Sequence, residues 1–162
     1  MFRLTGFKFG GFFALLLLMA MPFAAHAQNT ENPAPENAVT KKAKGIVFIG
    51  DSFKEALRQA QLQNKYIFVD AYASWCGPCK LLKATSFRNK KTAVYFNDNF
   101  INVSIDMEKG EGPELAMEWG IQAYPTLIIF DPSGKAISGT VGYMSGADLV
   151  RFGKQALAQS AN

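Results

Sequence analysis

Residues 66–80 of the chain read YIFVDAYASWCGPCK, and this stretch decides the fold. An apolar run at residues 66–69 precedes a pair of cysteines, and a helical pattern follows over residues 80–88. This order predicts a strand that brings Cys76 to a surface and a helix whose N-terminus lies beneath its sulfur. Backbone N–H groups and the helix dipole stabilise a thiolate there, which lowers a thiol pKa from about 8.5 towards about 7 or below. Pro78 fits the first helical turn, where a missing N–H is not needed.

Cys76 and Cys79 are the only cysteines in the chain. A zinc site would need four ligands, and the only histidine is His26, in a segment that we expect to be removed. A structural disulfide across two intervening residues would close a very short loop and constrain the unfolded chain little. Dithiol–disulfide redox chemistry is therefore favoured, with a structural pair and a metal site as the alternatives. We expect neither a metal nor a cofactor.

Residues 1–27 have the pattern of a secretory signal peptide. Arg3 and Lys8 give a positive start, an apolar stretch follows, and Ala25-His26-Ala27 is a small-x-small cleavage site. The apolar stretch, residues 10–25, is shorter than the roughly 20 residues that a spanning helix needs. Cleavage after Ala27 is therefore favoured over an uncleaved inner-membrane anchor that faces the periplasm. Export also fits the cysteine pair, because disulfides persist outside the cytoplasm. We expect a periplasmic protein.

Cleavage would change the composition of the remaining chain, residues 28–162. The formal net charge of +4 would fall by two. So small a positive charge does not indicate a nucleic-acid partner. Without His26, Cys–His and Ser–His nucleophilic catalysis are unavailable. Residues 28–44 are rich in Asn, Pro, Glu and Lys and predict a flexible linker. Residues 45–162 are long enough for one domain with its own core.

The hydrophobic pattern predicts alternating strands and helices. Ser52 and Glu55 fit a capping box at the first helix. The second strand is apolar apart from Asp70, which predicts a central strand buried on both faces. With right-handed crossovers, the order predicts an α/β fold with a central mixed β-sheet flanked by helices on both faces. We expect strands at residues 46–49, 66–73, 100–106, 126–130 and 135–141, and helices at residues 53–64, 80–88, 92–97, 113–120 and 145–159.

Residues 69–80, followed by Tyr124-Pro125-Thr126 and Gly142, resemble the thioredoxin family. The resemblance covers roughly residues 46–158. Its longer pattern is similar to exported bacterial thioredoxin-like proteins and to the periplasmic C-terminal domain of transmembrane thiol-reductant conductors. The resemblance implies a thioredoxin fold and a thiol–disulfide oxidoreductase.

The resemblance also implies a role for each matched position. Cys76 would be the exposed nucleophile that attacks a substrate disulfide, and Cys79, shielded one turn into the helix, would resolve the mixed disulfide. Pro125 would be a cis-proline beside the dithiol, and the backbone at Tyr124 would pair with an extended substrate chain. Asp70 would be a buried carboxylate beneath the second cysteine.

Asp70 can also be interpreted from its surroundings alone. A carboxylate inside an apolar strand is disfavoured unless paired or protonated, so its pKa should be raised. It would then be suited to take the proton of Cys79. The alternative is an Asp at the strand boundary that caps a loop. Trp75 directly precedes the nucleophile, which favours shielding or docking at the rim over simple aromatic packing. Gly77 and Pro78 are expected to contact substrate beside it.

Two positions depart from the thioredoxin pattern. Asn102 stands where the family has a buried lysine that partners the carboxylate, so the proton equilibrium of Asp70 and the pKa of Cys76 are expected to differ. The helix after Cys79 lacks the usual kinking proline, because residues 81–84 are Leu-Leu-Lys-Ala. We expect a straighter helix.

Reduction of protein disulfides is the favoured function, because the Gly-Pro dipeptide between the cysteines resembles that of reducing members. An oxidase or isomerase with the same residues is one alternative, and a non-catalytic, thiol-dependent binding or chaperone module is another. A reductase outside the inner membrane would draw its electrons from a membrane thiol-reductant conductor.

Overall fold

The computed structural model describes residues 44–160. The predicted signal peptide, and the predicted linker except Lys44, lie outside the described residues. The elements, in chain order, are α1 Phe53–Gln63, β1 Tyr66–Tyr72, α2 Gly77–Ala84, the 3₁₀ helix η1 Ser86–Arg88, α3 Lys90–Asn99, β2 Phe100–Asp106, α4 Gly112–Glu118, β3 Thr126–Phe130, β4 Ala136–Val141 and α5 Gly146–Ser160. Between residues 44 and 160, no helix is both long enough and apolar enough to span a bilayer.

The four strands form one mixed sheet in the order β2-β1-β3-β4. β1 pairs in parallel with β2 and antiparallel with β3, and β3 and β4 form a hairpin. β1 therefore lies inside the sheet, and residues 67–71 are buried, which confirms the predicted central strand. Its carboxyl end leads directly to the cysteine pair, so the best-supported strand of the sheet positions the site.

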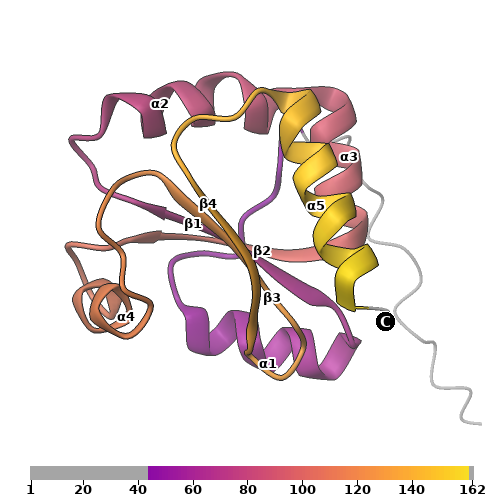
Figure 1. Ribbon diagram of the computed structural model, residues 1–162, viewed down its shortest axis with the longest axis horizontal. Coiled ribbons are helices and arrows are strands. Elements are labelled where there is room, and N and C mark those ends of the chain that lie inside the picture. Colours follow the sequence, from indigo (N-terminus) through magenta and orange to yellow (C-terminus); the bar gives the residue numbers. More distant parts are fainter. Residues whose placement is uncertain (1–43, 161–162) are drawn as a thin grey trace, which may run out of the picture. The chain divides into compact units, whose positions relative to one another are not determined.

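Helices cover both faces of the sheet, as the α/β prediction requires. Figure 1 shows α1 and α4 on one side of the strands and α2, α3 and α5 on the other. Alternate side chains of β1 enter the two cores, because successive residues of a strand point to opposite faces. Phe68 belongs to the core under α2, α3 and α5, and Ile67 and Val69 belong to the core over α1 and α4.

Residues 46–49 do not form the predicted first strand. Ile46 and Ile49 donate backbone hydrogen bonds to Phe87 O at 2.7 Å and Asn102 O at 2.9 Å. Between them, asparagine side chains form hydrogen bonds with the N–H and C=O of Val47, which would otherwise be free to pair with a neighbouring strand. Asn97 Oδ1 accepts from Val47 N at 2.9 Å, and Asn102 Nδ2 donates to Val47 O at 3.4 Å. The prediction is wrong because side-chain hydrogen bonds replace strand pairing here.

Local capping sets the ends of the helices. The helix predicted for residues 80–88 begins at Gly77, ends at Ala84 and continues as η1. Asn89 Oδ1 accepts from the N–H groups of residues 91 and 92, which explains why α3 begins earlier than predicted. At α1, Ser52 Oγ accepts from the Glu55 N–H at 3.4 Å, as in a capping box. The Glu55 carboxylate instead binds Arg58 and Gln59.

Phe68 gives a test of the core that supports β1. Its ring lies 4.6 Å from that of Phe96 and contacts three further phenylalanines, with no exposed surface. We expect Phe68→Ala to lower the free energy of unfolding by about 3–5 kcal/mol, because it leaves a cavity among these rings. Urea denaturation measures this loss. Leu62→Ala, at a position 73% exposed, should change stability by less than about 0.5 kcal/mol. A loss at Phe68 no larger than at Leu62 would contradict this account of the core.

Candidate functional site

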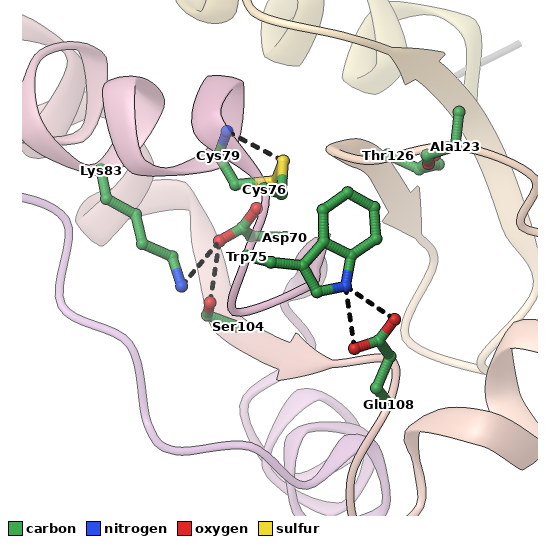
Figure 2. Close-up of a disulfide and its surroundings, with 9 residues drawn as sticks. All are labelled: Asp70, Trp75, Cys76, Cys79, Lys83, Ser104, Glu108, Ala123 and Thr126. Carbon is green, nitrogen blue, oxygen red and sulfur yellow. Dashed lines mark hydrogen bonds and ion pairs between the residues drawn. A yellow bond between two sulfur atoms is a disulfide. The ribbon is translucent and has the colours of Figure 1, made fainter.

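The cysteine pair lies where β1 gives way to α2. Cys76 is the N-cap of α2, and its Sγ accepts a hydrogen bond from the backbone N–H of Cys79 at 3.1 Å. Gly77 and Pro78 occupy the first helical turn, and the two sulfurs form a disulfide (Figure 2). The predicted placement of a helix N-terminus beneath the first sulfur is confirmed. On reduction, this N–H and the helix dipole would stabilise a thiolate at Cys76.

The exposure of the two cysteines differs from the prediction. Cys76 is 2% exposed and Cys79 is 1% exposed in the disulfide, so Cys76 is not the exposed member of the pair. The reason is packing, because both cysteines lie in a small cluster with Ala73 against the side chains of Tyr72 and Tyr124. The hydrogen bond from the helix, rather than exposure, distinguishes the sulfur of Cys76.

Asp70 is fully buried in β1, which excludes the alternative of a loop cap at the strand boundary. Its Oδ2 accepts from Ser104 Oγ at 2.8 Å and lies 3.8 Å from Lys83 Nζ. Within residues 44–160, no polar atom hydrogen-bonds its Oδ1, and Figure 2 shows this oxygen directed towards the disulfide. Burial raises the pKa of Asp70 to about 6, although Lys83 and Ser104 act in the opposite direction. A carboxyl group beneath the disulfide therefore titrates near neutral pH.

Sequence reasoning missed Lys83. It lies in the stretch of residues 81–84 that lacks a proline, and the sequence placed Asn102 at the position of the family's lysine. Asn102 does not replace the missing cation, because its amide donates to Val47 O and Phe96 O. The cation comes from α2, four residues after Cys79. Residues four apart share one face of a helix, so this spacing was a signal in the sequence.

Aromatic and acidic side chains form the rim of the site. Trp75 is 66% exposed, and its Nε1 donates to both carboxylate oxygens of Glu108, at 2.9 and 3.0 Å (Figure 2). Its ring meets that of Tyr124 edge-on, with the centroids 6.0 Å apart. The Tyr124–Pro125 peptide bond is cis, as predicted. Gly77 and Pro78 are exposed on the same turn as the disulfide. The structure therefore brings the predicted site residues together.

The arrangement can perform thiol–disulfide exchange. It combines two sulfurs in bonding contact, a helix N-terminus that stabilises one of them, and a carboxyl group suited to proton transfer beneath them. Residues 44–160 contain no cluster of three or more His, Cys, Asp or Glu side chains arranged to hold a metal ion.

Comparisons with known proteins lead to the same chemistry. A family model described as Thioredoxin matches residues 45–155. The chain is 29% identical over 135 residues to the thiol:disulfide interchange protein DsbD of Pseudoalteromonas atlantica. The matched region covers 81% of this chain and only 22% of that protein. It is 27% identical over 118 residues to the M-type chloroplast thioredoxin of Chlamydomonas reinhardtii. That match covers 73% of this chain and 78% of the thioredoxin.

A solved structure shows higher identity. It is the solution structure of a Bacteroides thetaiotaomicron protein that is provisionally described as a disulphide-isomerase. The identity is 43% and the TM-score 0.64, and the match covers 71% of this chain and 95% of that chain. The similarity thus extends over nearly the whole of that protein.

The raised pKa of Asp70 predicts how stability depends on pH. The folded state holds this proton more tightly than the unfolded state, so the stabilisation is complete below about pH 4 and is lost as the pH rises through about 6. The change from 3.8 to about 6 corresponds to about 3 kcal/mol. We therefore expect Asp70→Asn to unfold with a free energy up to about 3 kcal/mol higher than the parent protein at pH 7.5. Urea denaturation of the oxidised proteins from pH 4 to 8 measures the difference.

Asp98→Asn is the matched control, because Asp98 is exposed on α3. Its stability should follow the parent protein at every pH. An Asp70→Asn variant that is less stable than the parent at pH 7.5 would show that the buried carboxylate carries no unfavourable charge.

Proposed function

The chain belongs to the thioredoxin family of thiol–disulfide oxidoreductases, and we propose that it reduces disulfide bonds of proteins in the periplasm. The observation that carries this proposal is the disulfide at the N-terminus of α2 with the Asp70 carboxyl group beneath it. This combination supplies a stabilised attacking thiolate and a base for the second thiol. The chain spans less than a quarter of the DsbD protein that it matches, so that protein's whole activity is not carried over.

The catalytic roles follow from the positions of the two sulfurs. In the reduced protein, the Cys76 thiolate attacks one sulfur of a substrate disulfide and releases the other as a thiolate. Cys79 then gives its proton to Asp70, attacks Cys76 Sγ and releases the second substrate sulfur as a thiolate. Two electrons pass to the substrate, and the Cys76–Cys79 disulfide forms again. Cys76 is thus the nucleophile, Cys79 the resolving residue and Asp70 the base.

Substrate recognition is assigned to the rim. The Trp75 ring beside the disulfide offers apolar area with one polar edge. The loop before β3 is held by hydrogen bonds from Thr126 Oγ1 to Ala123 O and from Gly142 N to Pro125 O, both 2.7 Å. We assign the Tyr124 backbone in this loop to pairing with an extended substrate chain, as in other strand-addition modes. Gly77, Pro78 and Pro125 complete this proposed surface.

The proposed setting depends on the first 44 residues. Residues 1–27 would be a signal peptide cleaved after Ala27, residues 28–44 a flexible linker and residues 45–162 the thioredoxin-like domain. An uncleaved anchor in the inner membrane would place the same domain in the same compartment. A membrane thiol-reductant conductor is the proposed electron donor, and the match to a thiol:disulfide interchange protein supports this pairing.

A second candidate is disulfide isomerisation. It is favoured by the 43% identity to the Bacteroides thetaiotaomicron protein that is provisionally described as a disulphide-isomerase. Both activities use the same attack by Cys76. They differ in whether the protein leaves the substrate reduced or rearranged, which depends on the reduction potential of the cysteine pair.

The deciding experiment is the reduction potential of the Cys76–Cys79 couple, measured by equilibration with glutathione and dithiothreitol. We expect a value near that of thioredoxin, about −270 mV, because Gly-Pro separates the cysteines as in reducing members. A value near about −180 mV would favour the isomerase, and one near about −120 mV would make the protein an oxidase. Absence of exchange would favour the non-catalytic binding or chaperone module.

Single-cysteine variants test the proposed roles. We expect Cys79→Ser to accumulate a mixed disulfide with a substrate such as oxidised insulin, because Cys76 can attack but no second thiol can release the product. Non-reducing gel electrophoresis with mass spectrometry detects this adduct. Cys76→Ser is the matched control and should accumulate no such mixed disulfide, because it lacks the attacking thiol. If Cys76→Ser still restores function in cells, the binding module is correct and the reductase is not.

A further inference from the structure

A cation from the helix that carries the dithiol approaches the buried carboxyl group. Lys83 Nζ lies 3.8 Å from Asp70 Oδ2 and 3.0 Å from the centroid of the Tyr72 ring. The Lys83 side chain is 37% exposed, whereas Asp70 has no exposed surface. The ammonium group therefore lies at the boundary between the buried carboxyl group and solvent, held by an ion pair on one side and an aromatic face on the other.

A cavity lies beside this ion pair. It has a volume of about 550 Å³, and its lining includes Lys83, Ser104 and Tyr72, together with residues 44–48. Lys83 and Ser104 are the two partners of Asp70 Oδ2. The cysteines do not line this cavity. One carboxylate oxygen of Asp70 is therefore directed towards the disulfide, while the other contacts two side chains that reach the cavity.

We propose that Lys83 is a positioning residue that keeps Asp70 ionised before mixed-disulfide resolution, and that the proton of Cys79 leaves the site through the cavity at Lys83 and Ser104. This inference rests on the proposed function, in which Asp70 is the base. The Cys79 proton passes to Asp70 as the Cys79 sulfur bonds to Cys76 Sγ and the substrate thiolate leaves. The proton then moves past Ser104 to solvent in the cavity, and the carboxylate is restored beside the ammonium group.

The direction of the Lys83 effect follows from the groups around Asp70. α2 contributes Lys83 and Cys79, β2 contributes Ser104, and β1 contributes Tyr72. Burial lowers the pKa of Lys83, whereas Asp70 and Asp106 favour its charged form. Lys83 is thus the one cation in direct contact with the Asp70 carboxylate among residues 44–160. Without it, burial would act unopposed by a charge, and Asp70 would remain protonated to a higher pH.

Lys83→Met tests this role because it removes the charge and keeps most of the side-chain volume. The first measurement is the ¹³C NMR titration of the Asp70 carboxyl group in the oxidised protein, which needs no turnover. We expect its midpoint to rise by about one pH unit or more in Lys83→Met. Lys83→Arg, which keeps the charge, should stay close to the parent protein. Lys91→Met removes an exposed charge from α3 and should leave the midpoint unchanged.

The second measurement is the pH profile of mixed-disulfide resolution in single-turnover experiments. The acid limb of Lys83→Met should shift by the same interval as the titration. A rise of one pH unit makes resolution about fivefold slower at about pH 6 and about tenfold slower at about pH 5 or below, and the rates should converge at high pH. Attack by Cys76 on the substrate should be unaffected at high pH, where its thiolate is fully formed. In an Asp70→Asn background, Lys83→Met should cause no further shift.

The two measurements separate this inference from the proposed function. An Asp70 midpoint that is the same in Lys83→Met and the parent protein would overturn the positioning role, even if the enzyme reduces disulfides normally. A midpoint that shifts while the rate profile does not would overturn the link between Lys83 and resolution. A parent protein that exchanges no disulfide contradicts the proposed function, while the NMR titration still reports on the ion pair.

Discussion

A carboxyl group buried inside the central strand is the constraint on which this site depends. Asp70 occupies an interior position of β1, where both faces of the strand are packed. An ionised group there is unfavourable unless neighbours compensate, and the neighbours come from two elements, Ser104 of β2 and Lys83 of α2. The parallel pairing of β1 with β2 sets Asp70 opposite Ser104. The pairing of the strands thus supplies one of the hydrogen-bond donors that the Asp70 carboxylate needs.

The chemical groups are close together in the sequence as well as in space. Residues 70–83 supply the base, both sulfurs and the cation, because one strand leads through a short turn into one helix. The N-cap position of Cys76 follows from this local path alone. The rest of the chain contributes packing around these groups and the loop of Tyr124 and Pro125 beside them. The chemistry is therefore encoded locally, and the recognition surface is assembled from distant segments.

This division explains what could be predicted from the sequence. β2 and β3 have the predicted ends, and β1 differs by one residue at one end, because apolar runs identify buried strands. β4 also differs by one residue at one end, although it is largely exposed. The Asp70 environment was predictable for the same reason. The burial of Cys76 was not, because it depends on packing against Tyr124 from a distant loop. Lys83 was missed because a lysine in a helix usually faces solvent, and only the tertiary arrangement shows its carboxylate partner.

The irregular segment at residues 45–50 has a consequence for how this sheet can meet other chains. Asn97 and Asn102 hold that segment along β2, and Gly50 O accepts from Ser104 N at 3.3 Å. An open strand edge is a template for another strand, and proteins commonly cover such edges to avoid aggregation. Here the β2 side is covered by a stretch that is not a strand. Within residues 44–160, β4 is thus the edge of the sheet at which another strand can add.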